Sequence, residues 1–141
     1  MKTKVGINGF GRIGKAVLRI ALERDKGVDI VAINSTSGPE NHAHVFKYDS
    51  LYGKVDEEVK ATEDALHVGD KEIKFTRFRD PADIPWGDMG VDVVIEATGL
   101  FLTKEDASKH IQGGAKKVIL TAPAKTGEDL TVVMGVNENE Y

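Results

Sequence analysis

Three glycines near the amino terminus have the spacing of a phosphate-binding turn. Gly9, Gly11 and Gly14 stand within the stretch GINGFGRIG. In such a turn the first glycine permits a tight bend, the second lets a pyrophosphate approach the backbone, and the third permits close packing of a helix on a sheet. The N–H groups of Gly11, Arg12 and Ile13 would then face an anion at the positive end of a helix. The spacing predicts a dinucleotide site; the alternative is a glycine-rich turn that binds nothing.

The position that would contact the adenosine ribose of a dinucleotide carries no carboxylate. About 20 residues beyond a glycine fingerprint, an Asp or Glu normally accepts hydrogen bonds from the ribose hydroxyls. Here the apolar run 30–33 ends at Asn34 and is followed by Ser35, Thr36 and Ser37. The chain therefore binds either no dinucleotide or a different one.

Histidine and cysteine offer no competing chemistry. His42 and His44 are two positions apart, so on a helix they point about 200° from each other and cannot share a metal. His67 and His110 have no ligand spacing either. The chain has no cysteine, which rules out a disulfide framework and any thiol chemistry within it.

Composition indicates one ordinary globular domain. The 141 residues are 40% hydrophobic and 30% charged, with a formal net charge of −4. This charge gives no general attraction to nucleic acid or to an anionic membrane, and no apolar run approaches the ~20 residues of a membrane span. We expect a cytoplasmic protein with neither nucleic acid nor a membrane as a partner.

Strands and helices must alternate to position the glycine turn. Periodicity and turn signals predict strands at 4–8, 29–34, 91–97, 117–121 and 130–136, helices at 12–24 and 39–46, and a helix that begins at Thr103 and ends at Gly113-Gly114. Between 55 and 79 the period is two, and Gly69-Asp70 marks an antiparallel hairpin. The fold expected is α/β, a Rossmann-type doubly wound, mostly parallel sheet with a small antiparallel hairpin insertion.

Two helices carry more detailed signals. The first is expected to bury the face that carries Ile13, Val17, Ile20 and Ala21. The last helix begins with a sequence that resembles a capping box, because Thr103 is followed three residues later by Asp106.

Five stretches together resemble the phosphorylating glyceraldehyde-3-phosphate dehydrogenases. They are KVGINGFGRIGKAVLR, HVFKYDSLYGKV, FRDPADIPWGDMGVDVVIEATGLF, GAKKVILTAPAK and VVMGVNENEY. The resemblance covers the whole chain in order. The related erythrose-4-phosphate dehydrogenases share much of it and remain an alternative, although TAPAK is more similar to the glyceraldehyde-3-phosphate enzymes.

The resemblance implies a set of cofactor contacts. These would be Arg12 and Ile13 at the pyrophosphate, Asn34 at the adenosine ribose, Arg79 at the adenine, Thr98, Gly99 and Phe101 near the cofactor's centre, and Thr121 at the nicotinamide ribose. Simpler roles stay open: Arg12 as an exposed cation, Thr98 and Thr121 as strand caps, and Arg79 in an ion pair with Asp80 or Asp83.

The chain departs from the family pattern at two positions. Asn34 is commonly followed by Asp in the family, whereas Ser35 stands here, and the position of His42 is usually apolar. We interpret His42 as the mark of a more exposed helix face. Loss of the carboxylate removes a group that repels a 2′-phosphate, so we expect NADP to bind at least as well as NAD; a neutral replacement in an NAD-binding chain is the alternative.

The resemblance also implies an enzyme that oxidises an aldehyde through a thioester, passes hydride to a nicotinamide and releases an acyl phosphate. The family's nucleophilic cysteine and activating histidine have no counterpart here, so 1–141 is expected to be a dinucleotide-binding domain without its catalytic domain. The family's tetramer surfaces belong largely to that missing part, so we expect a monomer or weak dimer. A stand-alone dinucleotide-binding module is the other function class.

Overall fold

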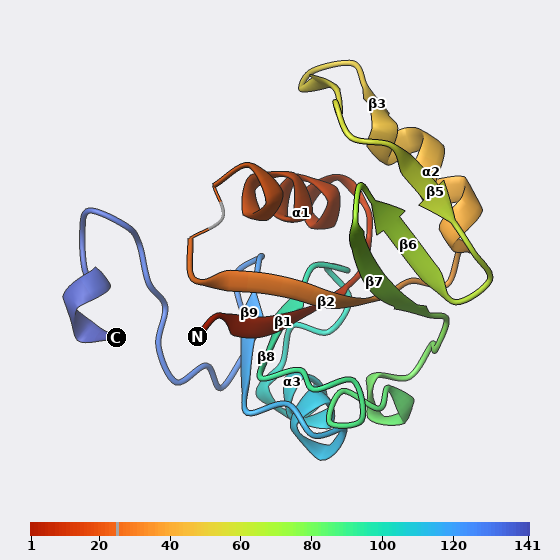
Figure 1. Ribbon diagram of the computed structural model, residues 1–141. Helices are drawn as coiled ribbons and strands as arrows, with labels where there is room; N and C mark the ends of the chain where they lie inside the picture. Colours follow the sequence, from red (N-terminus) through yellow and green to blue (C-terminus); the bar gives the residue numbers. More distant parts are fainter. Residues whose placement is uncertain (25) are drawn as a thin grey trace.

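A seven-stranded sheet with helices on both faces forms the body of the protein (Figure 1). The computed structural model describes residues 1–24 and 26–141. The sheet contains β1 (Thr3–Asn8), β2 (Val28–Asn34), β5 (Val59–Ala61), β6 (Ala65–Val68), β7 (Lys71–Thr76), β8 (Val93–Glu96) and β9 (Lys117–Leu120). The helices are α1 (Arg12–Arg24), α2 (Pro39–Lys47) and α3 (Lys104–Gln112), with short 3-10 turns η1 (Pro81–Asp83) and η2 (Glu138–Glu140). Strands β3 (Tyr48–Asp49) and β4 (Gly53–Lys54) pair to form a separate two-stranded ribbon.

The strand order is β5-β6-β7-β2-β1-β8-β9, and it confirms the expected sheet. Strands β7, β2, β1, β8 and β9 run parallel to their neighbours in this series. Strands β5 and β6 add to β7 as an antiparallel hairpin, with the β6–β7 turn at Gly69, whose φ is +57°. The chain builds outward from β1 on one side and then crosses to β8 on the other. The order therefore reverses at β1, the place where open α/β sheets bind ligands.

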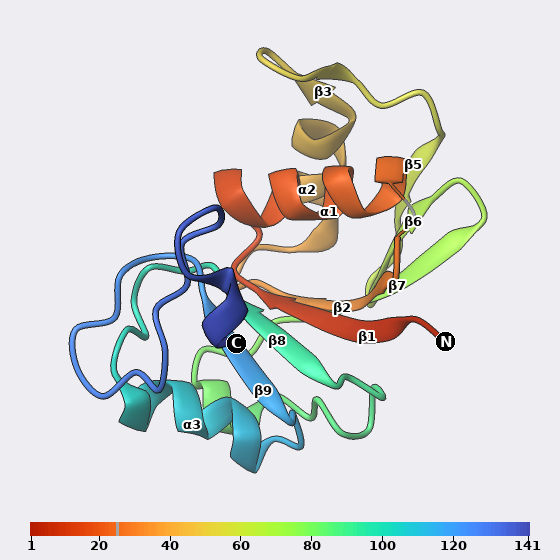
Figure 2. The same cartoon turned by 90° about the vertical axis from the view of Figure 1, so that its left-hand side faces the viewer.

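Helices α1 and α2 cover one face of the sheet and α3 covers the other (Figure 2). The first face holds the larger apolar core, to which α1 contributes Leu18 and α2 contributes Phe46, both almost fully buried. The second face packs around Trp86, whose ring lies on Gly6 of β1. A Cβ at Gly6 would stand 2.5 Å from that ring, so only glycine fits there.

The face of α1 expected from the sequence is confirmed only in part, because Val17 and Ala21 pack against the core. Ile13 and Ile20 are 50% and 48% exposed, while Gly14 and Leu18 are buried. Gly14 lies directly against the turn, since a Cβ there would stand 2.2 Å from the carbonyl oxygen of Gly9. This contact sets the rotation of the helix and turns Ile13 and Ile20 about 140–160° away from Leu18.

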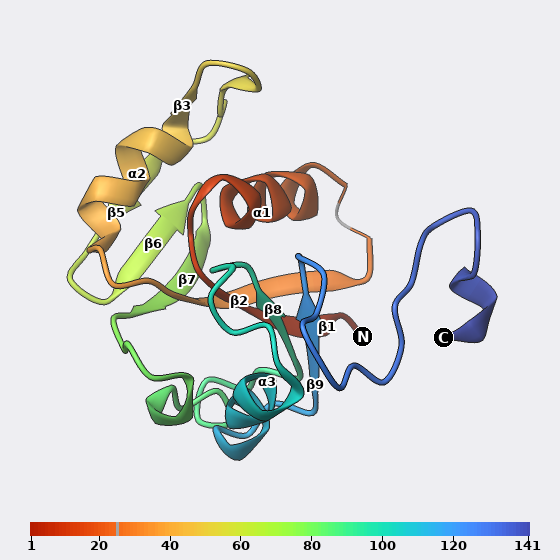
Figure 3. The ribbon, with the colours of Figure 1, turned by 180° about the vertical axis from the view of Figure 1, so that it is seen from behind.

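The sequence expectation of a strand at 130–136 was wrong. After β9 the backbone bonds to the start of α3, from Lys125 N to Leu102 O (2.8 Å) and from Lys104 N to Thr126 O (3.1 Å). These bonds take the chain away from the open edge of β9. The segment that follows is exposed and lies at the opposite end of the molecule from α2 and the β5–β6 hairpin (Figure 3).

The other predicted elements are confirmed to within a few residues. Thr103 caps α3, as its hydroxyl oxygen accepts a hydrogen bond from Asp106 N (3.1 Å). In the described part of the chain, no helix is both long and apolar enough to cross a membrane.

Candidate functional site

The site is built on the last residues of three neighbouring strands. Asn34 of β2, Asn8 of β1 and Glu96 of β8 are in register across the sheet. Their side chains are joined in a row, because Asn34 Nδ2 donates to Asn8 Oδ1 (2.8 Å) and Asn8 Nδ2 donates to Glu96 Oε2 (2.6 Å). We call this row the polar ladder. It aligns the strand ends from which the glycine turn and the loop after β8 depart.

The carboxylate of Glu96 is buried without a cation. Its Oε1 accepts from the backbone N–H and hydroxyl of Thr98, and its Oε2 accepts from Asn8 and from His110 Nε2 (2.7 Å). Trp86 Nε1 donates to His110 Nδ1 (2.9 Å), and an indole N–H only donates, so the imidazole proton is on Nε2. Burial alone would raise the pKa of Glu96, but the hydrogen bonds from His110, Thr98 and Asn8 outweigh it and hold the pKa below its usual value.

The three glycines of the turn have the geometry that their spacing predicts. Gly9 has a φ of +94°, and a Cβ there would stand 2.8 Å from Thr98 N, so the β1 and β8 loops touch at this point. Gly14 lies against the carbonyl of Gly9, as described above. A Cβ at Gly11 would meet no described atom within 4 Å. The turn is therefore tightly packed at its two ends and open in its middle, where a ligand would approach.

The start of α1 presents unpaired backbone donors beside Gly11. The first N–H groups of a helix have no intrahelical acceptor, and those of Arg12 and Ile13 belong to this first turn. The guanidinium of Arg12 is directed elsewhere: its Nη1 pairs with Asp49 Oδ2 at 2.8 Å, and its Cζ lies 5.6 Å from the ring centre of Tyr52. The side chain of Arg12 is therefore already paired with Asp49 of the same chain, and the backbone of Arg12 rather than its side chain faces the turn.

Asn34 is a positioning residue rather than a donor to a ligand. Besides its bond to Asn8, its Nδ2 donates to Phe78 O (2.9 Å). Its Oδ1 accepts from Thr76 Oγ1 (2.8 Å) and Phe78 N (2.9 Å), which uses all four bonds that an amide can make. Asn34 thus connects β2 to β1 and to the loop after β7.

The loop that follows Asn34 holds Ser35 half-buried and leaves Thr36 exposed. Ser35 N bonds to Thr76 O (3.0 Å). The guanidinium of Arg77 lies over this loop, since its Nη2 is 3.2 Å from the position of a Cβ at Gly38. Arg79 is exposed. Asp80, one of its suggested partners, instead pairs with Lys109 (3.7 Å) and caps η1.

The remaining predicted residues lie at the ends of β8 and β9. Thr98 caps β8, donating to Glu96 and accepting from Leu100 N (3.1 Å). Gly99 has a φ of +72° in the same loop, and Phe101 is half-buried after it. Thr121 is exposed just beyond β9, and its N–H and hydroxyl both donate to Glu96 O, at 3.2 and 3.3 Å. The simple capping role considered for both threonines is therefore present.

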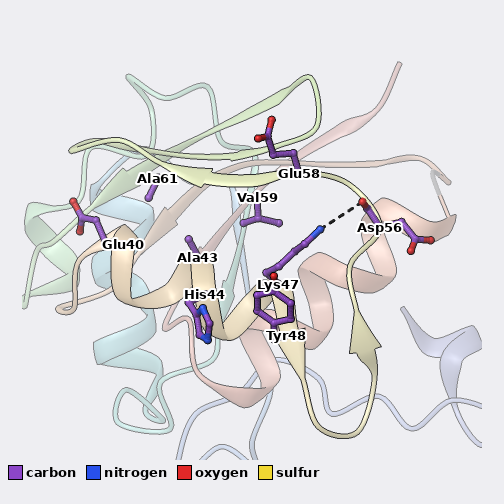
Figure 4. Close-up of a pocket in the computed structure, with 9 residues that line it drawn as sticks. All are labelled: Glu40, Ala43, His44, Lys47, Tyr48, Asp56, Glu58, Val59 and Ala61. Carbon is purple, nitrogen blue, oxygen red and sulfur yellow. Dashed lines mark hydrogen bonds between the residues drawn. The ribbon is translucent and has the colours of Figure 1, made fainter.

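A surface hollow lies elsewhere. It has a volume of about 690 Å³ and lies between α2 and β5, with Lys47 in its wall (Figure 4). The ammonium of Lys47 donates to Val55 O (2.5 Å) and Glu57 O (2.6 Å), so its charge is already satisfied. No residue of the glycine turn lines this hollow. Within residues 1–24 and 26–141, no group of three or more His, Cys, Asp or Glu side chains could hold a metal.

Comparison with known proteins indicates a dinucleotide-binding domain, as the glycine turn does. Residues 3–104 match the family model described as glyceraldehyde 3-phosphate dehydrogenase, NAD binding domain. The chain belongs to this family. Glyceraldehyde-3-phosphate dehydrogenases of Streptomyces coelicolor and Geobacillus stearothermophilus are 53% and 50% identical over 141 residues, all of this chain. One from Bacillus cereus is 52% identical over 139 residues, 99% of this chain. The chain spans 41–42% of the length of these relatives.

Sequence reasoning missed several residues of this NAD-binding domain. Asn8, Glu96 and His110 form the polar network beneath the turn. A signal was present for two of them, because a polar residue ending an apolar strand is placed at the sheet edge where parallel α/β folds bind ligands. For His110 there was none, since its partners come from β8 and from the loop before it.

His42 was assigned to the wrong environment. It is half-buried, not exposed, and its ring packs edge-on to Phe10 with centroids 5.4 Å apart. Its Nε2 is 2.9 Å from Ser35 Oγ, and its Nδ1 is 2.9 Å from Lys15 Nζ. The two positions at which the chain departs from the glyceraldehyde-3-phosphate dehydrogenase pattern are therefore in direct contact. The tertiary fold brings them together from β2 and α2.

Proposed function

We propose that this chain is the cofactor-binding part of a cytoplasmic phosphorylating glyceraldehyde-3-phosphate dehydrogenase and that it binds NADP as well as NAD. The observation that carries the proposal is the open space over Gly11, flanked by the close contacts at Gly9 and Gly14. It lies where the strand order reverses, and the first N–H groups of α1 are directed at the same place. In the whole enzyme the cofactor would accept hydride from an aldehyde bound by the remaining part.

The pyrophosphate is proposed to lie over Gly11, with Gly9, Arg12 and Ile13 around it. The adenosine would extend past Ser35 and Thr36 towards Arg79, and the nicotinamide half past Thr98, Gly99, Phe101 and Thr121. Asn34 and Gly14 would shape this path without contacting the cofactor through their side chains. Each of these positions follows the strand ends described above.

Replacing Gly11 tests the pyrophosphate position. Gly11→Val adds a side chain to the open space and should abolish binding of both cofactors while the fold is retained. Calorimetric titration gives the affinity and thermal unfolding reports the fold. Ser50→Val adds bulk at an exposed turn and should change neither. Cofactor affinity that is unchanged in Gly11→Val would refute the assignment.

The preference for NADP follows from the charge at position 35. Two unit charges about 4 Å apart at an effective dielectric of ~20 interact by roughly 4 kcal/mol, so a carboxylate there strongly disfavours a 2′-phosphate. Its loss removes charge-assisted bonds to the ribose of NAD worth about 1.5–3 kcal/mol. The repulsion is the larger of the two, so the net shift favours NADP.

Restoring the carboxylate tests this preference. Wild type should bind NADP at least as tightly as NAD, and Ser35→Asp should reduce NADP affinity relative to NAD by at least about tenfold. The two titrations are run side by side on each protein. A wild type that already binds NAD far more tightly, combined with no change in Ser35→Asp, would contradict the proposal.

A further inference from the structure

Three side chains from three elements form a continuous hydrogen-bonded row beside the glycine turn. Lys15 is on α1, His42 is on α2, and Ser35 follows β2. Lys15 Nζ is 2.9 Å from His42 Nδ1, and His42 Nε2 is 2.9 Å from Ser35 Oγ. We call this row the relay.

The donors and acceptors of the relay have a defined direction. A lysine ammonium only donates, so His42 Nδ1 must accept and the imidazole proton is on Nε2. His42 Nε2–H then donates to Ser35 Oγ. The hydroxyl hydrogen of Ser35 remains to be donated to another group. At the position where the family commonly has an acceptor-only carboxylate, this chain presents a donor connected to a cation.

The relay contains two groups that resist carrying positive charge. Burial lowers the pKa of Lys15 to about 8, and burial together with the Lys15 charge lowers the pKa of His42 to about 4. The aromatic rings of Phe10 and Phe75 pack on His42, with centroids 5.4 and 5.8 Å away. A bound anion would favour the charged form of both groups.

The described neighbours supply no such anion. Lys15 Nζ also donates to the carbonyl of Phe10 and lies 4.7 Å from the centre of its ring. The acidic residue of the adjoining part of α2, Glu40, faces Arg77 (3.9 Å) over Gly38. Within residues 1–24 and 26–141, no carboxylate pairs with Lys15 or His42.

We propose that Lys15, His42 and Ser35 form a subsite for the 2′-phosphate of NADP, in which Lys15 and His42 determine specificity. This inference rests on the proposed dinucleotide binding. A phosphate dianion has only acceptor oxygens, so it matches the hydroxyl donor of Ser35. The ammonium of Lys15 holds the imidazole in the tautomer that leaves that donor available. Ser35 thus replaces an acceptor with a donor, and His42 keeps the hydrogen of that donor available for the phosphate.

The test compares two small probes that differ only in the 2′-phosphate, adenosine 2′,5′-bisphosphate and adenosine 5′-monophosphate. Wild type should bind the bisphosphate more tightly. His42→Leu, which restores an apolar residue, and Lys15→Met should each lower the affinity ratio about tenfold, because each breaks the row that orients the Ser35 hydroxyl towards the phosphate. His44→Leu makes the same chemical change two residues away at an exposed position and should leave the ratio unchanged.

Proton uptake on binding distinguishes a direct role of Lys15 in the subsite from a merely structural one, because a structural role would not change the uptake. At pH 8 Lys15 is about half protonated in the free protein, so binding the bisphosphate should take up as much as about half a proton. Calorimetry in two buffers of different ionisation enthalpy measures this number. The uptake should disappear in Lys15→Met and be absent with the monophosphate.

The outcomes separate the two proposals. If the wild type binds neither probe nor either cofactor, the proposed function and this inference both fall. If the wild type binds NAD and the monophosphate, but the bisphosphate binds no more tightly, the subsite alone is refuted. An affinity ratio that His42→Leu and Lys15→Met leave unchanged also refutes the relay.

Discussion

Gly11 and Gly14 stand three positions apart, yet a side chain at each would meet very different surroundings. At Gly14 a Cβ would stand 2.2 Å from the carbonyl oxygen of Gly9, whereas at Gly11 it meets no described atom within 4 Å. Gly14 therefore serves the packing of α1 on the turn, and Gly11 leaves space for a ligand. Their effects on stability and on binding should separate.

Gly14→Ala should lower the free energy of unfolding by about 1–3 kcal/mol, because the backbone of Gly9 and the side chain of Ile7 must move to admit the methyl group. Gly11→Ala should change it by less than about 1 kcal/mol, since the methyl group enters open space at the start of the helix. Urea unfolding of the two variants makes the comparison. Equal destabilisation would show that the turn is not packed as described.

At the scale of elements, the polar ladder holds the strand ends in register. Glu96 links β8 to β1 through Asn8 and to α3 through His110, and it orients the loop after β8 through Thr98. A buried carboxylate without a cation is stable here because each oxygen accepts two hydrogen bonds. The apolar core alone would leave the register of these strand ends less strictly defined.

Glu96→Gln should lower the free energy of unfolding by about 1–3 kcal/mol at pH 7, because one carboxylate oxygen becomes a donor that faces other donors. The pKa of Glu96 is lowered in the folded state, so its contribution to stability is present above pH 4.5 and is lost as the pH falls through the folded pKa. Glu96→Gln should therefore lose less stability than wild type below pH 4.5. Urea unfolding between pH 7 and 3 measures both, and the exposed Glu23→Gln is the control. Parallel pH curves for wild type and Glu96→Gln would contradict the assignment.

At the scale of the whole molecule, the sheet and its helices form a cofactor-binding body, while 121–141 extends beyond β9. The exposed apolar side chains of that segment include Val133, Met134 and Val136. The family's acyl chemistry needs a thiolate, and this chain has no cysteine. Cofactor binding and turnover should therefore be separable.

The chain by itself should bind cofactor but give no turnover with glyceraldehyde 3-phosphate and phosphate, because no thioester can form on it. Absorbance of the reduced nicotinamide measures the rate with each cofactor. Turnover above a heat-treated control, after host enzyme has been removed, would disprove this expectation. Sedimentation of the same sample should show a monomer or weak dimer.

The local features of this protein could be predicted from its sequence. The spacing of the glycines, the apolar period and the Thr103 cap depend on neighbours within a few residues, so the turn, α1, α3 and the parallel strands were predictable. The strand expected at 130–136 was not formed, because pairing requires a partner edge and the chain is drawn towards α3 instead.

Contacts between residues distant in the sequence could not be predicted, because they depend on how the helices pack on the sheet. The rotation of α1, the partner of Arg12, and the network of Glu96 with His110 all depend on contacts between elements far apart in the chain. The clearest case is His42, whose presence at a usually apolar position of the family was interpreted as the mark of a more exposed helix face. Packing of α2 beside the end of β2 places its ring between Lys15 and Ser35, because the strand and helix directions bring those three side chains to one point.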